Sequence, residues 1–277
     1  MVKRILVAAV GIPALLFIMC WCPPWATAVL LVLLCAIAAH ELMAALCTKP
    51  IANRWWGCAA ILAALVTLAP WLRQTEGPVG AVLTWLTAAF TAVLFFALIM
   101  EHGKEGGLRF YDLCILAVAG VAIPMALGCL LRLRLLDHGA GLVMIPLVAA
   151  FCSDSMALFT GMACGRHKLI PSVSPNKTRE GAVGGLVGGM VGMVLFRIVF
   201  FLVTEVQLHI GWCLLMGLVG ALLGQMGDLV FSCIKRESGI KDYGRLLPGH
   251  GGVLDRFDSV IFAAPLIWLL ASSAALY

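Results

Sequence analysis

Charge is the scarcest property of this sequence. Only 12% of its 277 residues are Asp, Glu, Lys or Arg, whereas 62% are hydrophobic and the mean hydropathy is +1.05. Soluble domains carry roughly 25% charged residues, so too few charges remain here to solvate the surface of a soluble protein. The composition therefore excludes a soluble domain and predicts an integral membrane protein.

Several motifs of soluble enzymes and metal sites are also missing. The sequence contains no C-x-x-C pair, no Walker A motif, no H-E-x-x-H and no G-x-S-x-G. Its 11 cysteines lie almost entirely inside apolar runs, which is typical of buried thiols. We therefore expect neither disulfides nor a zinc site.

What the sequence has instead is long apolar runs. Runs of about 18 residues or more are typical of transmembrane helices, and an all-α integral membrane protein of about nine such helices is predicted. The runs cover residues 5–22, 25–47, 55–72, 79–100, 111–131, 140–165, 181–203, 209–232 and 258–277. The basic start and the first run also suit a signal peptide, but no A-x-A-like cleavage site follows, so we expect a retained first span.

Lys and Arg are unevenly divided between alternate flanks of these runs. Arg73, Arg132 and Arg134 fall on one side and Arg197 lies within a run, which leaves fifteen of the nineteen basic residues on the other side. Cytoplasmic flanks of membrane proteins are rich in Lys and Arg. The N-terminus is therefore predicted to be cytoplasmic and the C-terminus to lie on the opposite side of the inner (cytoplasmic) membrane.

The same count places two long polar stretches, residues 166–180 and 233–257, on the cytoplasmic side. Both belong to residues 136–277, which we expect to form a transmembrane catalytic region. Residues 1–135 would form about five further spans. Any chemistry in the two polar loops is then open to cytosolic nucleotides and Mg²⁺.

Five charged residues interrupt the apolar runs, namely Glu41, Asp112, Asp154, Arg197 and Asp228. A charge at mid-bilayer costs at least about 2.5–3.5 kcal/mol, so each needs a reason to be there. Glu41 and Asp112 are expected to be structural, with Arg197 snorkelling or neutralising an acid. Asp154 and Asp228 lead directly into the polar stretches, which favours a functional role.

Asp228, Ser232 and Lys235 are spaced so that they share one face of a helix continuing to about residue 236. A carboxylate, a hydroxyl and an ammonium on one face suit a Mg²⁺–phosphate site, because Mg²⁺ prefers one or two carboxylates with water and substrate phosphates. Positive-inside anchoring alone would explain the basic residues, but it does not need a buried acid.

The second feature is the turn PGHGG at residues 248–252. A helix is expected just after it, with its first N–H groups free to bind an anion. Acids favour a first helical turn for dipole reasons alone, which explains one Asp but not Asp255, Arg256, Asp258 and His250 together. With the basic stretch 164–181, which suits lipid headgroups, nucleotide phosphates or topology, the pattern predicts Mg²⁺-dependent phosphoryl or nucleotidyl transfer.

Glycine recurs every four residues in the run 181–203, at Gly184, Gly188 and Gly192. Such faces let helices approach closely in lipid. We expect helix packing within the fold or in a homodimer.

The stretch SCIKRESGIKDYGRLLPGHGGVLDRFD, residues 232–258, resembles the signature of the phosphatidate cytidylyltransferase (CDP-diacylglycerol synthase) family. HKLIPSVSPNKTREG, residues 167–181, resembles that family's second motif, although Leu158, Arg166 and Arg179 depart from the usual pattern. The resemblance implies that the chain converts CTP and phosphatidate into CDP-diacylglycerol and pyrophosphate in phospholipid biosynthesis. It implies Mg²⁺ as cofactor, leaves room for a second, monovalent cation, and makes CTP, phosphatidic acid and membrane lipids the partners, with no nucleic acid.

The resemblance also implies roles for individual residues. The catalytic residues would be Asp228, Lys235, Lys241 and Asp255, and the metal ligands Asp154, Asp228, Asp255 and Asp258. The substrate- and phosphate-binding residues would be Lys168, Lys177, Arg179, Ser232, Arg236, Asp242, His250, Gly251, Gly252 and Arg256.

The residues are also compatible with two other functions. A CTP-dependent kinase of a polyprenol-type lipid would use similar groups but would yield a phosphorylated lipid and CDP. A transporter would use the intramembrane acids for an ion pathway, but no inverted repeat is evident and the polar residues gather at one membrane face.

Overall fold

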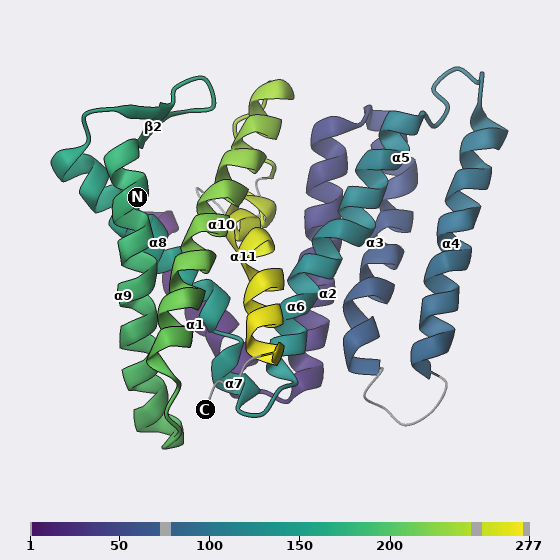
Figure 1. Cartoon of the computed structure of the whole chain (residues 1–277). Coiled ribbons are helices and arrows are strands. Elements are labelled where there is room, and N and C mark those ends of the chain that lie inside the picture. The colour runs from purple at the N-terminus through teal and green to yellow at the C-terminus, as the bar shows by residue number, and fades with distance from the viewer. Residues whose placement is uncertain (1, 73–78, 245–250, 274–277) are drawn as a thin grey trace. The chain divides into compact units, whose positions relative to one another are not determined.

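The structure, a computed structural model, describes residues 2–72, 79–244 and 251–273 (Figure 1). Among the described residues, six helical segments are long and apolar enough to cross a membrane. These are Pro24–Leu46, Lys49–Leu72, Phe110–Arg134, Gly139–Cys164, Arg179–Thr204 and Ile210–Glu237. The predicted class, an all-α membrane protein, is confirmed, with one short β-hairpin added to it.

The chain divides into two compact units that alternate along the sequence. The first comprises Met1–Leu135 and Ile240–Arg256, and the second comprises Leu136–Gly239 and Phe257–Tyr277. The stretch that carries the family resemblance is thus shared between the units, and each unit contains part of the predicted site.

The first unit is a group of helices packed around α2 and α3. α2 contacts α3 and α6, and buried Leu31, Leu42, Leu62 and Leu127 form part of the core between them (Figure 1). Its elements are α1 (Val2–Cys20), α2 (Pro24–Leu46), α3 (Lys49–Leu72), α4 (Val79–Glu101), α5 (Phe110–Ala117), the π-helical turn η1 (Val118–Ala122) and α6 (Ile123–Arg134). Pro24 occupies the first turn of α2, where its missing N–H would have no helical partner.

The second unit is built on three helices in mutual contact. They are α8 (Ile145–Cys164), α9 (Arg179–Thr204) and α10 (Ile210–Glu237), preceded by the short α7 (Gly139–Leu142) and joined by most of α11 (Leu254–Ser273). A Cβ atom at Gly184, Gly188 or Gly192 would collide with a side chain of α8. The glycine repeat therefore serves packing within the chain, the first of the two expected roles.

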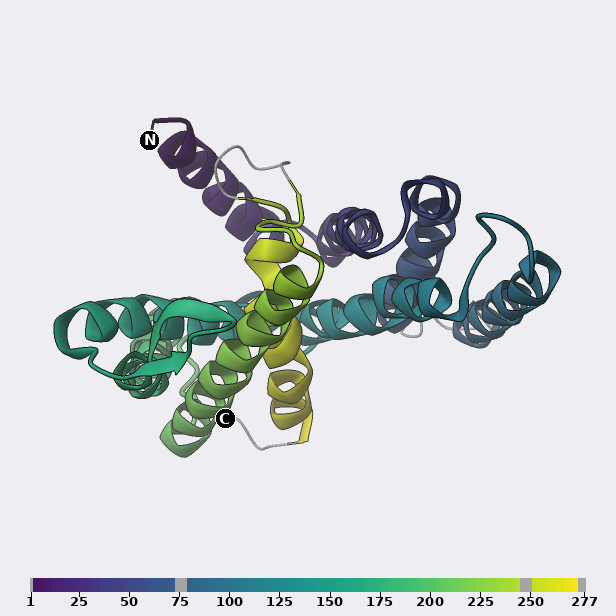
Figure 2. The same cartoon turned by 90° about the horizontal axis from the view of Figure 1, so that it is seen from above.

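The polar stretch before α9 forms an antiparallel hairpin rather than an irregular loop. Strand β1 (Lys168–Ile170) pairs with β2 (Ser174–Thr178), and a register shift lies between the two pairings. Thr178 ends β2 and caps α9, because its Oγ1 accepts a hydrogen bond from the N–H of Gly181 at 3.1 Å. Figure 2 shows the hairpin crossing the ends of α8 and α9, both of which β2 contacts.

Two of the intramembrane charges have backbone partners. Asp112 is buried, and its carboxylate accepts a hydrogen bond from the N–H of Arg109 at 3.0 Å at the start of α5. The Nε of Arg197 donates to the carbonyl oxygen of Leu208 at 2.6 Å. The partner of the Arg197 guanidinium is therefore a backbone carbonyl. Among the described residues, no ion pair joins Arg197 to an acid, which was the other expected role.

Candidate active site

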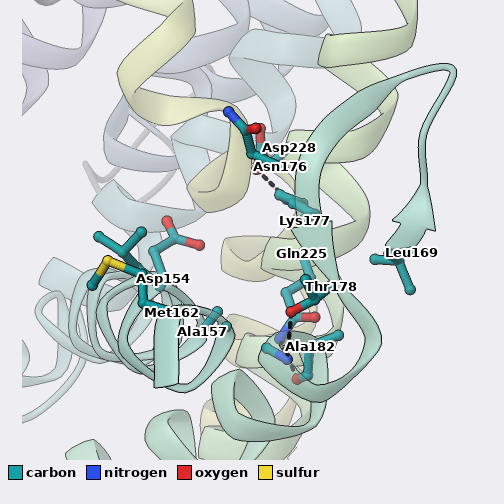
Figure 3. Close-up of a pocket in the computed structure, with 13 residues that line it drawn as sticks. Asp154, Ala157, Met162, Leu169, Asn176, Lys177, Thr178, Ala182, Gln225 and Asp228 are labelled. Carbon is teal, nitrogen blue, oxygen red and sulfur yellow. Dashed lines mark hydrogen bonds and ion pairs between the residues drawn. The ribbon is translucent and has the colours of Figure 1, made fainter. Parts of the chain in front are cut away.

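A pocket of about 460 Å³ lies in the second unit between α8, α10 and the hairpin (Figure 3). Polar side chains from all three elements face it: Asp154, Asn176, Lys177, Thr178, Gln225 and Asp228. The remaining wall is apolar, with Leu158 and Met162 of α8 and Leu169 of β1 among its residues. The pocket thus combines a charged end with an apolar side, as a site for an amphiphilic or nucleotide substrate would.

An ion pair between Lys177 of β2 and Asp228 of α10 closes the charged end of this pocket. The two side chains are 29% and 28% exposed, so water still reaches the pair. The hydroxyl of Ser232 donates to Oδ1 of Asp228 at 3.3 Å, as their spacing on one helix face predicts. Because partly exposed pairs contribute only about 0–1 kcal/mol, Lys177 can exchange its partner for a substrate phosphate at little cost.

Further predicted residues of the second unit lie near this pair. Asp258 of α11 is buried and lies close enough to Asp228 and Asp154 to be repelled by their charges and close enough to Lys235 to be attracted. Oδ1 of Asp258 accepts a hydrogen bond from the N–H of Ser259 at 2.7 Å. Negative charge is therefore concentrated at this end of the unit.

This donor set can be compared with what a metal ion needs. Within residues 2–72, 79–244 and 251–273, no group of three or more His, Cys, Asp or Glu is placed to hold a metal ion by itself. Mg²⁺ seldom needs such a group, because it keeps several waters and takes its remaining oxygens from substrate phosphates. The carboxylate of Asp228, beside the hydroxyl of Ser232, fits this partial donor set.

The basic residues of the hairpin region are more exposed than Lys177. Lys168 points into solvent from β1, and the exposed Arg179 donates its backbone N–H to the carbonyl oxygen of His167 at 2.9 Å. Arg236 of α10 is exposed, and its Nε donates to the carbonyl oxygen of Val173 at the tip of the hairpin, at 3.3 Å. These three predicted phosphate-binding residues are therefore not among those that line the pocket.

In the first unit, the carboxylate of Asp255 binds the backbone of the polar stretch 233–257 at two places. Its Oδ2 accepts hydrogen bonds from the N–H groups of Tyr243 and Gly252, both at 2.9 Å, and its side chain is buried. Gly251 adopts a φ of +81°, a backbone conformation that favours glycine. Lys241, Asp242 and Arg256 are exposed, whereas His250 lies outside the described residues.

Glu41 of α2 also binds the backbone of this turn. Its carboxylate accepts hydrogen bonds from the N–H groups of Val253 at 3.0 Å and Leu254 at 2.9 Å, and only 5% of Glu41 is exposed. A Cβ atom at Gly244 or Gly252 would collide with the same carboxylate. The expectation that the first N–H groups of this helix are free to bind an anion is therefore wrong for Val253 and Leu254, because the carboxylate of Glu41 already accepts hydrogen bonds from both.

The sequence did not predict the contacts of two residues of these sites, Glu41 and Gln225. Glu41 contacts residues more than 200 positions away, so its spacing carried no signal beyond the cost of a charge in an apolar run. Gln225 lines the pocket one helical turn before Asp228, and its polarity inside the run 209–232 was the signal that could have identified it.

Comparisons with known proteins point in one direction. The profile of the Cytidylyltransferase family matches residues 2–274. The chain is similar to the phosphatidate cytidylyltransferase of Bacillus subtilis (strain 168), with 38% identity over 162 residues, which cover 58% of this chain and 59% of the relative. The proteins of the same name from Staphylococcus haemolyticus (strain JCSC1435) and Staphylococcus aureus (strain COL) are 38% identical over 157 and 158 residues, 57% of each chain. The chain thus spans about three fifths of the length of the curated relatives it matches.

Proposed function

This chain belongs to the Cytidylyltransferase family, and from that premise we propose that it transfers the cytidylyl group of CTP to phosphatidic acid. The products are CDP-diacylglycerol and pyrophosphate, and the reaction serves phospholipid biosynthesis. The observation that carries the proposal is the pocket in which Lys177 and Asp228 meet beside an apolar wall, with the hydroxyl of Ser232 bonded to Asp228. The names of the relatives, all phosphatidate cytidylyltransferases, support the same substrates.

The chemistry asks little of the protein beyond positioning and charge neutralisation. A phosphate oxygen of phosphatidate attacks the α-phosphorus of CTP, the bond from that phosphorus to the β-phosphate oxygen breaks, and pyrophosphate leaves with the electron pair. A phosphate monoester already carries a charge of about −1.5 to −2 at neutral pH, so no strong general base is needed. Lys177 would leave Asp228 to bind a phosphate, and Lys168, Arg179, Lys235 and Arg236 would stabilise the negative charge of the two substrates.

Mg²⁺ is part of the proposal. Asp228 would hold the ion, with Asp154 and Asp258 nearby in the second unit. Asp255, in the first unit, stays a ligand that the family resemblance implies. Bound Mg²⁺ would neutralise charge on the reacting phosphates. A second, monovalent cation stays compatible with the same acidic residues.

We also propose the finer membrane arrangement. The six spans, with α1, α4 and α11 added, would give nine, with a cytoplasmic N-terminus and the C-terminus across the inner membrane. The bias of Lys and Arg supports this orientation, in which the pocket would face the cytoplasm. A homodimer through residues 181–203 would have to use the outer face of α9, because α8 packs on the glycine repeat.

The test is turnover by the purified protein with CTP, phosphatidic acid and Mg²⁺. Pyrophosphate release and a CDP-lipid identified by mass spectrometry are expected, whereas a phosphorylated lipid alcohol with CDP would indicate a lipid kinase. Asp228→Asn should lower turnover by about 100-fold or more, because a charge at the reacting phosphates is lost. Val230→Ala, an exposed position on the same helix, is the matched control and should keep wild-type turnover.

A further inference from the structure

Gln225 is held in one orientation within the pocket. Its Nε2 donates to Oγ of Ser153 on α8 at 3.2 Å and to the carbonyl oxygen of Ala182 on α9 at 3.1 Å. Both N–H bonds of the amide are therefore used, and turning the amide over would place Oε1 against the carbonyl oxygen of Ala182 and lose that hydrogen bond. Figure 3 shows Gln225 beside Thr178 and Ala182, with its bond to Ala182 drawn.

The fixed amide leaves its oxygen for a ligand. In the described part of the chain, Oε1 of Gln225 has no hydrogen-bond partner, and Gln225 lines the pocket. This oxygen can only accept, so it complements a ligand N–H donor and repels a carbonyl oxygen. The pocket therefore presents an acceptor whose polarity cannot be reversed without losing the hydrogen bond to Ala182 that holds it.

The position of Gln225 relative to the charged end suggests which part of a nucleotide it meets. Gln225 precedes Asp228 by three residues on α10, and side chains three apart lie on one helix face, about 5–6 Å apart. Phosphates bound at Lys177 would thus leave the nucleobase of the same molecule near Gln225. Leu158 and Leu169 supply apolar surface on which a flat ring can lie, and the exposed amide of Asn176 offers a donor to ring acceptors.

Cytosine matches this arrangement. It carries the exocyclic N4 amine, a donor, next to the N3 and O2 acceptors, whereas uracil presents the O4 carbonyl at the position of the amine. We propose that Gln225 is the residue that selects cytosine, by accepting a hydrogen bond from its N4 amine. The inference rests on the proposed function and adds to it the nucleobase subsite and the basis for rejecting UTP.

The experiment measures kcat/KM with phosphatidic acid for CTP and for UTP. The wild-type protein should prefer CTP by about 100-fold or more, because sites built around a substrate hydrogen bond discriminate strongly. Gln225→Met keeps the length of the side chain but removes the acceptor, so the preference should fall by about 10-fold or more through a loss of kcat/KM for CTP. Ser153→Ala removes one tether but keeps the acceptor and the bond to Ala182, and it should retain the wild-type preference.

Three results would overturn the assignment: a wild-type protein that uses UTP as well as CTP, Gln225→Met with the wild-type preference, or Ser153→Ala with the same loss as Gln225→Met. The first of these needs no variant, so it holds even where Gln225→Met does not fold. Failure of the proposed function looks different, because the wild-type protein would then form no CDP-lipid from CTP.

Discussion

The contact of Glu41 with the N–H groups of Val253 and Leu254, called here the Glu41 clamp, predicts how substitutions of Glu41 change stability and turnover. The carboxylate accepts two backbone N–H groups, from Val253 and Leu254, and is almost fully buried. Glu41→Ala leaves both N–H groups without an acceptor, at about 1–3 kcal/mol each, so the free energy of unfolding should fall by about 2–6 kcal/mol. Glu41→Gln keeps one acceptor and turns the other into a donor that faces an N–H group. It should lose about 1.5–3 kcal/mol.

Measuring turnover as well as stability shows whether the contact of Glu41 with this turn supports catalysis or only stabilises the fold. Thermal unfolding in detergent gives the loss of stability, and pyrophosphate release is then measured well below the lowest melting temperature. Glu41→Gln should lower kcat by about 10-fold or more with a smaller change in KM for CTP, because Asp255 follows the clamped residues directly. Asp112→Asn is the matched control, since it too loses a buried charged hydrogen bond in the first unit, to Arg109. Wild-type kcat in Glu41→Gln, or an equal loss in Asp112→Asn, would refute the reasoning.

Three further predictions concern the second unit. Lys177→Met should lower kcat/KM for CTP by about 100-fold while thermal stability stays within about 1 kcal/mol, because the ion pair is partly exposed; wild-type kinetics would remove Lys177 from the site. Gly184→Val should lower the melting temperature, since overpacking α9 against Thr160 costs about 1–3 kcal/mol, whereas Val183→Leu on the exposed face should not. Thr178→Ala should lose about 1 kcal/mol of stability as its cap on α9 is removed, and an unchanged melting temperature in detergent would show that this cap does not stabilise α9.

Local spacing allowed part of the site to be predicted. Asp228 and Ser232 are four residues apart on a helix that ends at Glu237, and their hydrogen bond follows from that spacing alone. The membrane class followed from composition, because apolar runs of sufficient length leave few alternatives. Both properties depend only on neighbouring residues, which a sequence displays directly.

The remaining features depend on distant residues. The hairpin was not predicted because both strands are short and β2 is polar and contains Pro175, so no alternation of apolar residues marks it. The contact of Glu41 with Val253 and Leu254 joins parts of the chain that only the tertiary fold brings together. The same holds for the pair Lys177–Asp228, since membrane topology alone explained Lys177 and no spacing in the sequence linked it to Asp228.

The central claim is that the cytidylyl group moves from CTP to the lipid. Its most direct test supplies the purified protein with phosphatidic acid, Mg²⁺ and CTP labelled either at the α-phosphate or at the γ-phosphate. The α-label should appear in the extracted lipid and the γ-label in pyrophosphate. Recovery of the γ-label in the lipid, with the α-label retained in CDP, would contradict the account.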